Sequence, residues 1–151
     1  MNCCIEVDQL HYLGKKVLVV GMARSGVGAA KLLCAQGAQV TVNDSKTEEE
    51  LGDVLAGIEG LKLERCFGCS ADALLEGKDV LVLSPGIPDK SPFVTRAREM
   101  GIFVEAEIEL ASQLSRGDLV AVTGTNGKTT TVTLLDEIFR ASGRRSHAVG
   151  N

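Results

Sequence analysis

The sequence lacks long apolar runs, an excess of positive charge and a paired set of cysteines. Its longest apolar stretches are only a few residues, as in Val17 to Val20, far short of the ~20 needed to cross a bilayer, so no membrane insertion is expected. Sixteen basic against twenty acidic residues give a net charge of −4, which argues against a nucleic-acid partner. Met1 to Asp8 carries no basic patch followed by a long apolar segment, so we expect no secretory signal and a cytoplasmic location.

The five cysteines are odd in number, which does not suit a disulfide framework, so reduced thiols are expected. Cys66 and Cys69 form a C-x-x-C and, with Cys3 and Cys4, could supply four sulfur ligands to zinc. Because Cys3 and Cys4 are adjacent and lack the usual two-residue gap, we favour small buried or surface thiols.

What is present is typical of a globular α/β protein. The 151 residues are 44% apolar and 24% charged, enough to build a hydrophobic core. Short β-branched runs alternate with segments of helical period, the pattern of βαβ units that build a parallel sheet. Strands are expected at 16–20, 40–43, 61–66, 80–83 and 102–104, and helices at 25–36, from 47 onwards, at 92–100 and at 107–114.

The most linker-like stretch, 115–118, predicts a boundary between a domain at 1–115 and a second domain at 116–151. The second would open with a strand at Leu119 to Thr123, a glycine loop and a helix from Lys128 to about Ser142, with a possible strand start at His147 to Val149. One strand, one loop and one helix cannot bury an α/β core. We therefore favour a fragment of a longer protein over a last unit that extends the first sheet.

The glycine loop predicts phosphate binding. It lies between an expected strand and helix, where backbone N–H groups and the helix dipole favour phosphate, a lysine can reach the terminal phosphates and a threonine hydroxyl can bind Mg²⁺. It is shorter than the standard G-x-x-x-x-G-K-[ST] loop, since Val122 stands where the first glycine is required. The candidate ATP-binding residues are Gly124, Thr125, Asn126, Gly127, Lys128, Thr129 and Thr130, with Thr129 as the Mg²⁺ ligand.

A second glycine loop, Gly21 to Gly26, nearly fits a dinucleotide fingerprint. In that fingerprint the middle glycine admits a pyrophosphate and an acid after the next strand binds ribose hydroxyls. Here the middle position is Ala23, and Asp44 is the acid. The combination favours a nucleotide-like ligand.

Two further segments carry weaker signals for a binding site. Ser84-Pro85-Gly86 follows a buried-type strand, at whose carboxyl end the ligand crevice of an open α/β sheet lies. Taken alone, the segment is better explained as a rigid turn. The alternating acids Glu105, Glu107 and Glu109 are expected to form a solvated face. No role is assigned to His11 or His147.

Together these motifs resemble the amino-terminal part of the Mur ligases, and within them the branch that adds D-glutamate. The resemblance spans nearly the whole chain, and the phosphate loop is shared with folylpolyglutamate synthetases. It rests on Val19 to Gly26, Asp44, Leu83 to Ile87, Glu107 to Leu110 and Val122 to Thr130.

The resemblance implies a Rossmann-like domain that binds the UDP of UDP-N-acetylmuramoyl-L-alanine, followed by the start of a P-loop ATPase domain. It places Arg24 and Ser25 near the substrate phosphates, Asp44, Ser45 and Lys46 near uracil and ribose, and Ser84, Pro85 and Gly86 beside the same nucleotide. Asn151 matches an asparagine near the sugar.

In the family, ATP phosphorylates the substrate carboxylate, D-glutamate attacks the acyl phosphate, and ADP and phosphate leave. The resemblance implies that Lys128 is catalytic, because it neutralises charge on the transferred phosphoryl group with Mg²⁺. The 151 residues alone are expected to be inactive in peptidoglycan precursor ligation. Three alternatives stay open: an NAD-type Rossmann domain, which leaves the second loop unexplained, a stand-alone nucleotide sensor, and a folate-type ligase, which leaves the first loop without a purpose.

Overall fold

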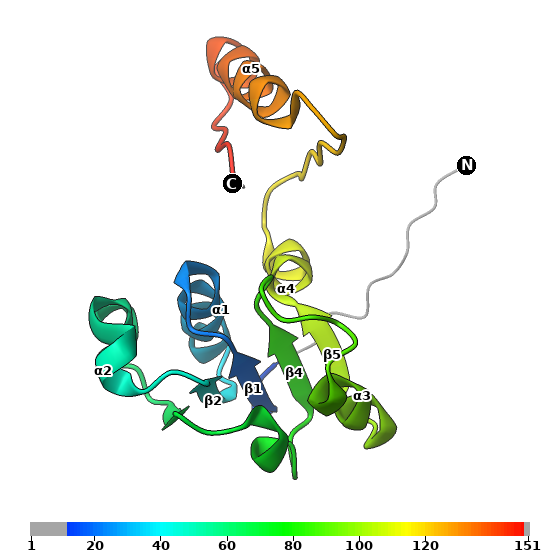
Figure 1. Ribbon diagram of the computed structural model, residues 1–151. Coiled ribbons are helices and arrows are strands. Elements are labelled where there is room, and N and C mark those ends of the chain that lie inside the picture. The colour runs from blue at the N-terminus through cyan, green and yellow to red at the C-terminus, as the bar shows by residue number, and fades with distance from the viewer. Residues whose placement is uncertain (1–11, 150–151) are drawn as a thin grey trace. The chain divides into compact units, whose positions relative to one another are not determined.

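The computed structural model describes residues 12–149, and the chain divides into two compact units, Met1–Ser115 and Arg116–Asn151. The first unit is built on a sheet of five parallel strands in the order β3-β2-β1-β4-β5 (Figure 1). An α/β fold with a parallel sheet is thus confirmed. The strands are β1 (Lys16–Val20), β2 (Gln39–Asp44), β3 (Glu64–Phe67), β4 (Val80–Leu83) and β5 (Phe103–Ala106).

The central strands are buried on both faces, as a parallel sheet between two layers of helices requires. On β1, Val17 and Val19 belong to one apolar cluster while Leu18 and Val20 belong to the other. This alternation follows from the two-residue period of a strand. Every residue of β4 is likewise buried.

Helices cover both faces of this sheet. One apolar cluster contains residues of α1 (Arg24–Ala35), α4 (Glu107–Leu114), α2 (Glu48–Leu51) and the 3₁₀ segment η1 (Gly52–Ile58). The other contains residues of α3 (Pro92–Glu99) and the 3₁₀ segment η2 (Ala71–Leu74). Pro92 stands in the first turn of α3, as expected from its fixed φ.

The helix expected after Thr47 is shorter than its sequence suggested. Thr47 does form a capping box, since its hydroxyl accepts from Glu50 N at 3.4 Å and the Glu50 carboxylate accepts from Thr47 N at 2.8 Å. After Leu51 the chain passes through Gly52 at φ +50°, which no α-helix residue adopts, and continues as a 3₁₀ segment.

A buried polar face on β2 fastens the edge strand β3 to the sheet. Thr41 and Asn43 are 3% and 1% exposed. The Thr41 hydroxyl donates to Glu64 Oε2 at 2.9 Å and accepts from Lys78 Nζ at 2.6 Å. Asn43 Nδ2 donates to the Cys66 carbonyl at 2.7 Å. On this face of β2, hydrogen bonds therefore hold the neighbouring strand in place, whereas on the opposite face Val40 and Val42 pack into the apolar core.

The expectation that Glu105, Glu107 and Glu109 form a solvated face is wrong for Glu105, and Glu107 is half-buried. The Glu105 side chain is buried, accepting from the Tyr12 hydroxyl at 2.7 Å and from Gln113 Nε2 at 3.3 Å. Burial raises the pKa of Glu105, although these hydrogen bonds oppose the rise. Glu109 is exposed and accepts from Ala106 N at 2.9 Å, so it helps to start α4.

Over residues 116–149 the second unit contains one helix, α5 (Lys128–Ala141), followed by Gly143 at φ +78°. The strands expected at Leu119 to Thr123 and at His147 to Val149 are not formed. A strand is defined by hydrogen bonds to a neighbour, and none of the described residues pairs with either segment, which leaves Leu119 and Val120 58% and 60% exposed. Among residues 12–149, no helix is long and apolar enough to cross a membrane, and the expected cytoplasmic location stays a prediction.

Candidate functional site

The first candidate site is at the carboxyl ends of β1 and β4, where the strand order reverses. The chain runs outward from β1 through β2 to β3, then returns to pair β4 with the other side of β1. In open α/β sheets, ligands bind outside the carboxyl ends of the strands at this reversal. The loops after β1, β2 and β4 meet here, and the candidate residues of the first unit lie in these loops or directly beside them.

Gly21 and Gly26 are required by close packing. A Cβ on Gly21, at φ +94°, would lie 2.8 Å from Ser84 Cβ, and one on Gly26 would lie 1.9 Å from the Gly21 carbonyl oxygen. The Ser84 hydroxyl donates to that same oxygen at 2.7 Å. The loop after β1, the first turn of α1 and the loop after β4 are thereby held against one another.

Asp44 ties the loop after β1 to the loop after β2. Its Oδ2 accepts from Met22 N at 2.7 Å and its Oδ1 accepts from Lys46 N at 3.0 Å. A carboxylate has about four acceptor positions, so two bonds leave room for hydroxyl donors of a ligand. The half-buried Asp44 therefore both shapes the crevice and keeps acceptor capacity at its edge.

The amino terminus of α1 suits an anion. Ala23 is its N-cap and offers no side-chain acceptor, and no acid stands in the first turn. The first N–H groups of a helix carry partial positive charge, and Arg24, exposed in that turn, adds a full one. Ser25 is half-buried beside it.

The remaining nominated residues of this unit lie around the same loops. Ser45 and Lys46 are exposed after β2, and Pro85 and Gly86 are exposed after β4. Ser84 is buried, and its carbonyl accepts from Ile87 N at 3.0 Å, so Ser84 to Ile87 form a tight turn. Asn151 lies outside the described residues.

Sequence reasoning missed Asn43 and the turn after β3. Gly68 N donates to the carbonyls of Asp44 at 3.0 Å and Lys46 at 2.9 Å, so this turn supports the loop after β2. The alternation Val40-Thr41-Val42-Asn43 was the available signal, because two polar residues on one face of an interior strand require polar partners.

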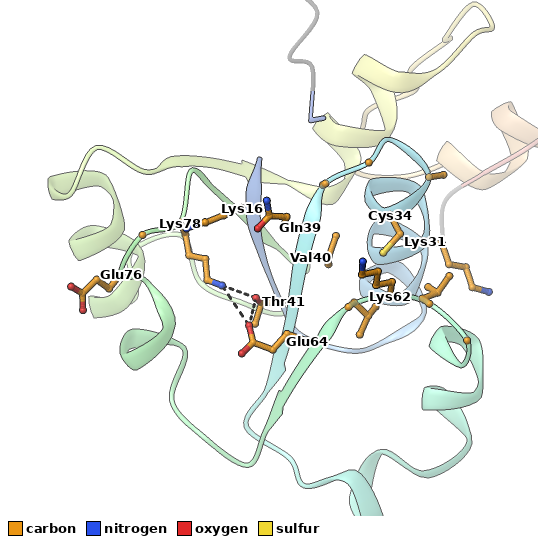
Figure 2. Close-up of a pocket in the computed structure, with 17 residues that line it drawn as sticks. Lys16, Lys31, Cys34, Gln39, Val40, Thr41, Lys62, Glu64, Glu76 and Lys78 are labelled. Atoms are coloured by element: carbon orange, nitrogen blue, oxygen red, sulfur yellow. Dashed lines mark hydrogen bonds and ion pairs between the residues drawn. The ribbon is translucent and has the colours of Figure 1, made fainter. Parts of the chain in front are cut away.

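A cavity of about 990 Å³ lies elsewhere, at the amino ends of β1, β2 and β3 (Figure 2). None of the nominated residues lines it. Within this cavity, Lys78 Nζ donates to the Thr41 hydroxyl and lies 4.0 Å from Glu64 Oε2. The positive charge of Lys78 is therefore already paired with the carboxylate of Glu64. This cavity therefore lies between β2, β3 and the residues before β4, and it is not part of the candidate site at the carboxyl ends of the strands.

The second candidate site is the loop at the start of α5. Gly127 is the helix N-cap at φ +77°, a left-handed conformation that favours glycine, and no side chain caps the helix. Lys128 Nζ donates to the Gly124 carbonyl at 2.5 Å, so the lysine folds back over its own loop. Thr125, Asn126, Thr129 and Thr130 are exposed beside it.

The first unit thus has a parallel-sheet, Rossmann-like fold with a glycine loop at its switch point. Comparison with known proteins identifies its family. The model of the Mur ligase MurD-like N-terminal domain matches residues 15–106, so the chain belongs to this family.

Individual relatives agree with this family assignment. The chain is 48% identical over 137 residues to the UDP-N-acetylmuramoylalanine–D-glutamate ligase of Exiguobacterium sibiricum and 45% identical over 139 residues to that of Alkaliphilus metalliredigens. Each match covers 91% of this chain and 30% of the relative, so the chain spans about a third of the length of these curated relatives.

Solved structures share the fold at lower identity. A murein peptide ligase from Psychrobacter arcticus matches with a TM-score of 0.59 at 22% identity, covering 86% of this chain and 27% of its own. The UDP-N-acetylmuramate–alanine ligase of Thermotoga maritima matches with a TM-score of 0.53 at 23% identity, covering 85% and 30%.

Proposed function

We propose that the first unit binds the UDP part of UDP-N-acetylmuramoyl-L-alanine at the carboxyl ends of β1, β2 and β4. The observation that carries the proposal is the joint of Gly21, Asp44 and Ser84 at the switch point, beside a helix terminus with no side-chain cap. The uncapped amino terminus of α1 and the positive charge of Arg24 favour binding of the negatively charged diphosphate.

Each nominated residue has a role in this proposal. Arg24 and Ser25 bind the diphosphate, Asp44 with Ser45 and Lys46 binds ribose and uracil, and the turn at Ser84, Pro85 and Gly86 contacts the same nucleotide. Because the Ser84 proton is committed to the Gly21 carbonyl, Ser84 acts by positioning the loop and by its remaining lone pairs. Asn151 is assigned to the sugar by family likeness alone.

We further propose that residues 124–130 hold the phosphates of ATP. The loop's residues fit the group, since Gly127 is left-handed, the terminus of α5 is uncapped and Lys128 lies over the loop. Lys128 would exchange its bond to the Gly124 carbonyl for phosphate oxygens, and Thr129 would contribute its hydroxyl to Mg²⁺. Bound Mg²⁺ and ATP supply the transferable phosphoryl group and offset its developing charge.

For the whole protein, we propose an ADP-forming ligase of peptidoglycan precursor synthesis that adds D-glutamate to UDP-N-acetylmuramoyl-L-alanine. The names of relatives at 45–48% identity support it. Because the chain spans about a third of those relatives, we expect these 151 residues to bind without catalysing ligation. ADP release that depends on both substrates would contradict this expectation.

A reciprocal pair of variants tests the two sites. Arg24→Ala removes a charge from the first site and should weaken UDP-sugar binding while leaving ATP binding unchanged. Lys128→Ala should do the opposite. Calorimetric titration of both variants with both ligands measures the split, and equal loss of both ligands in either variant would mean that the sites are misassigned.

A further inference from the structure

The turn after β3, Cys66 to Cys69, is a part of the first unit that the proposed function leaves unused. It is wrapped around one buried amide. Asn43 Nδ2, on a side chain 1% exposed, donates to the carbonyls of Cys66 at 2.7 Å and Cys69 at 3.1 Å and approaches Cys69 Sγ at 3.4 Å. We call Cys66 to Cys69 the C-x-x-C turn.

Both cysteines of this turn are placed by pairing with Asn43 or by contacts to Asn43 and the backbone of the turn itself. Cys66 is the register partner of Asn43 on the neighbouring strand, so both side chains point to the same face of the sheet. Cys69 Sγ, which contacts the Asn43 amide on that face, donates to the Cys66 carbonyl at 3.6 Å. Both cysteines are free thiols. Cys-x-x-Cys is the arrangement that disulfide oxidoreductases use to close a disulfide between two thiols.

The C-x-x-C turn also supports the nucleotide loop. Gly68 N donates to the Asp44 carbonyl at 3.0 Å and to the Lys46 carbonyl at 2.9 Å. Gly68 adopts φ +67°, and its Cα faces the side chain of Thr47. Any change in the path of the turn therefore acts directly on Asp44 to Lys46.

The environments of the two thiols set the order of reaction. Cys69 is exposed, whereas Cys66 is half-buried. Burial, Glu64 and Cys69 raise the pKa of the Cys66 thiol, against the opposing charge of Lys78. Cys69 therefore meets an external oxidant first, and Cys66 follows as the resolving thiol. Within residues 12–149 no group of three His, Cys, Asp or Glu side chains converges, and Cys3 and Cys4, which the four-sulfur zinc alternative also requires, lie outside the described residues.

We propose that Cys66 and Cys69 are a redox modification site whose disulfide loosens Asp44 to Lys46 and weakens nucleotide binding. The oxidant is hydrogen peroxide. The Cys69 thiolate attacks one oxygen, the O–O bond breaks and one water leaves. The Cys66 thiolate then attacks the sulfenic sulfur, forming the S–S bond as a second water leaves, so two thiols and one peroxide give one disulfide and two waters.

Closing the disulfide removes bonds that the reduced turn makes. The Cys69 thiol loses its proton and with it the contact to the Cys66 carbonyl, and its sulfur turns from the Asn43 amide toward Cys66. The backbone between the two cysteines must follow, which lengthens the bonds from Gly68 N to Asp44 and Lys46. The effect on ligand affinity rests on the proposed function, whereas disulfide formation and loosening of the loop do not.

The test uses the 151-residue chain with Cys3, Cys4 and Cys34 replaced by serine, so that only Cys66 and Cys69 can react. After hydrogen peroxide treatment, peptide mass mapping should find a two-hydrogen loss within one molecule that dithiothreitol reverses. Amide hydrogen exchange should then be faster at Gly68. UDP should bind about tenfold more weakly, the effect of about one hydrogen bond. Cys69→Ser is the matched control, because its hydroxyl can accept from Asn43 Nδ2 and donate to the Cys66 carbonyl but cannot form a disulfide.

Each outcome decides a separate claim. Absence of the intramolecular disulfide, or unchanged exchange at Gly68 after it forms, overturns the inference. A disulfide that loosens Gly68 but leaves UDP affinity unchanged overturns its link to binding. If the reduced chain does not bind UDP, the proposed function fails, and the mass and exchange data still decide the inference.

Discussion

Gly26→Ala should destabilise the first unit, although alanine is the better helix former. The added Cβ would lie 1.9 Å from the Gly21 carbonyl oxygen, about 1.5 Å short of ordinary contact at 3.4 Å. That oxygen belongs to backbone and is held by the Ser84 hydroxyl, so it cannot rotate away. The helix or the loop must move.

The magnitude follows from opposing terms. Overpacking costs about 1–3 kcal/mol, and a strained or lost bond from Ser84 adds about 1 kcal/mol. Replacing a helix-interior glycine returns about 1 kcal/mol. The expected loss in the free energy of unfolding is therefore about 1–3 kcal/mol. Gly28→Ala is the matched control, because nothing lies within 4 Å of its Cβ and the same helix should gain about 1 kcal/mol.

Urea unfolding followed by tyrosine fluorescence measures both variants. Tyr12 is the one tyrosine, the chain has no tryptophan, and Tyr12 is 1% exposed within the first unit, so the signal reports that unit. Equal stabilities for Gly26→Ala and Gly28→Ala would refute the packing account of the glycine loop.

Three further variants test other parts of the fold, each by urea unfolding followed by circular dichroism. Asn43→Leu should lower the free energy of unfolding by about 1–3 kcal/mol, because the carbonyls of the C-x-x-C turn lose their hydrogen-bond donor. The control Gln39→Leu, at an exposed position of the same strand, should change it by no more than about 0.5 kcal/mol. Equal effects of the two variants would contradict the role of the Asn43 amide. Thr47→Ala should cost about 0.5–2 kcal/mol through loss of the capping box, and an unchanged midpoint would show that the cap is dispensable. The third variant concerns Glu105, whose pKa is raised in the folded state, so that on raising the pH the unfolded chain releases this proton first. The contribution of Glu105 to the free energy of unfolding is therefore fully present below the ordinary carboxyl pKa and is lost as the pH rises through the folded pKa. Between the unfolded and folded pKa values of Glu105, the free energy of unfolding of the unchanged chain should fall by at most about 1.4 kcal/mol per pH unit relative to Glu105→Gln. Parallel pH profiles for the two proteins would contradict the raised pKa of Glu105.

The sheet and its helices could be predicted because their signals are local. β1, β4 and α4 occupy the residues that apolar runs and helix-terminal signals indicated, and Gly37 follows the end of α1 with φ +77°. The strand at Leu119 to Thr123 was wrongly predicted, because an apolar run indicates a strand only where a neighbouring strand supplies hydrogen bonds.

The candidate site was predictable in its loops but not in its internal bonds. The glycine spacing indicated Gly21 and Gly26, and the position at the end of β2 indicated Asp44. That Ser84 binds the Gly21 carbonyl, and that Asn43 holds the turn after β3, depends on strand order, which brings residues 63 and 26 positions apart into contact. The buried Glu105 escaped prediction for the same reason, since its partner Tyr12 is 93 positions away.

The measurement that tests the central claim most directly is calorimetric titration of the reduced chain with UDP-N-acetylmuramoyl-L-alanine, with NAD titrated in parallel. A ligand at about 100 times its dissociation constant adds about 2.7 kcal/mol of stability, so a thermal-shift series checks any binding found. The account predicts saturable binding of the UDP-sugar and none of NAD. Binding of NAD without the UDP-sugar would contradict it and favour an NAD-type Rossmann domain.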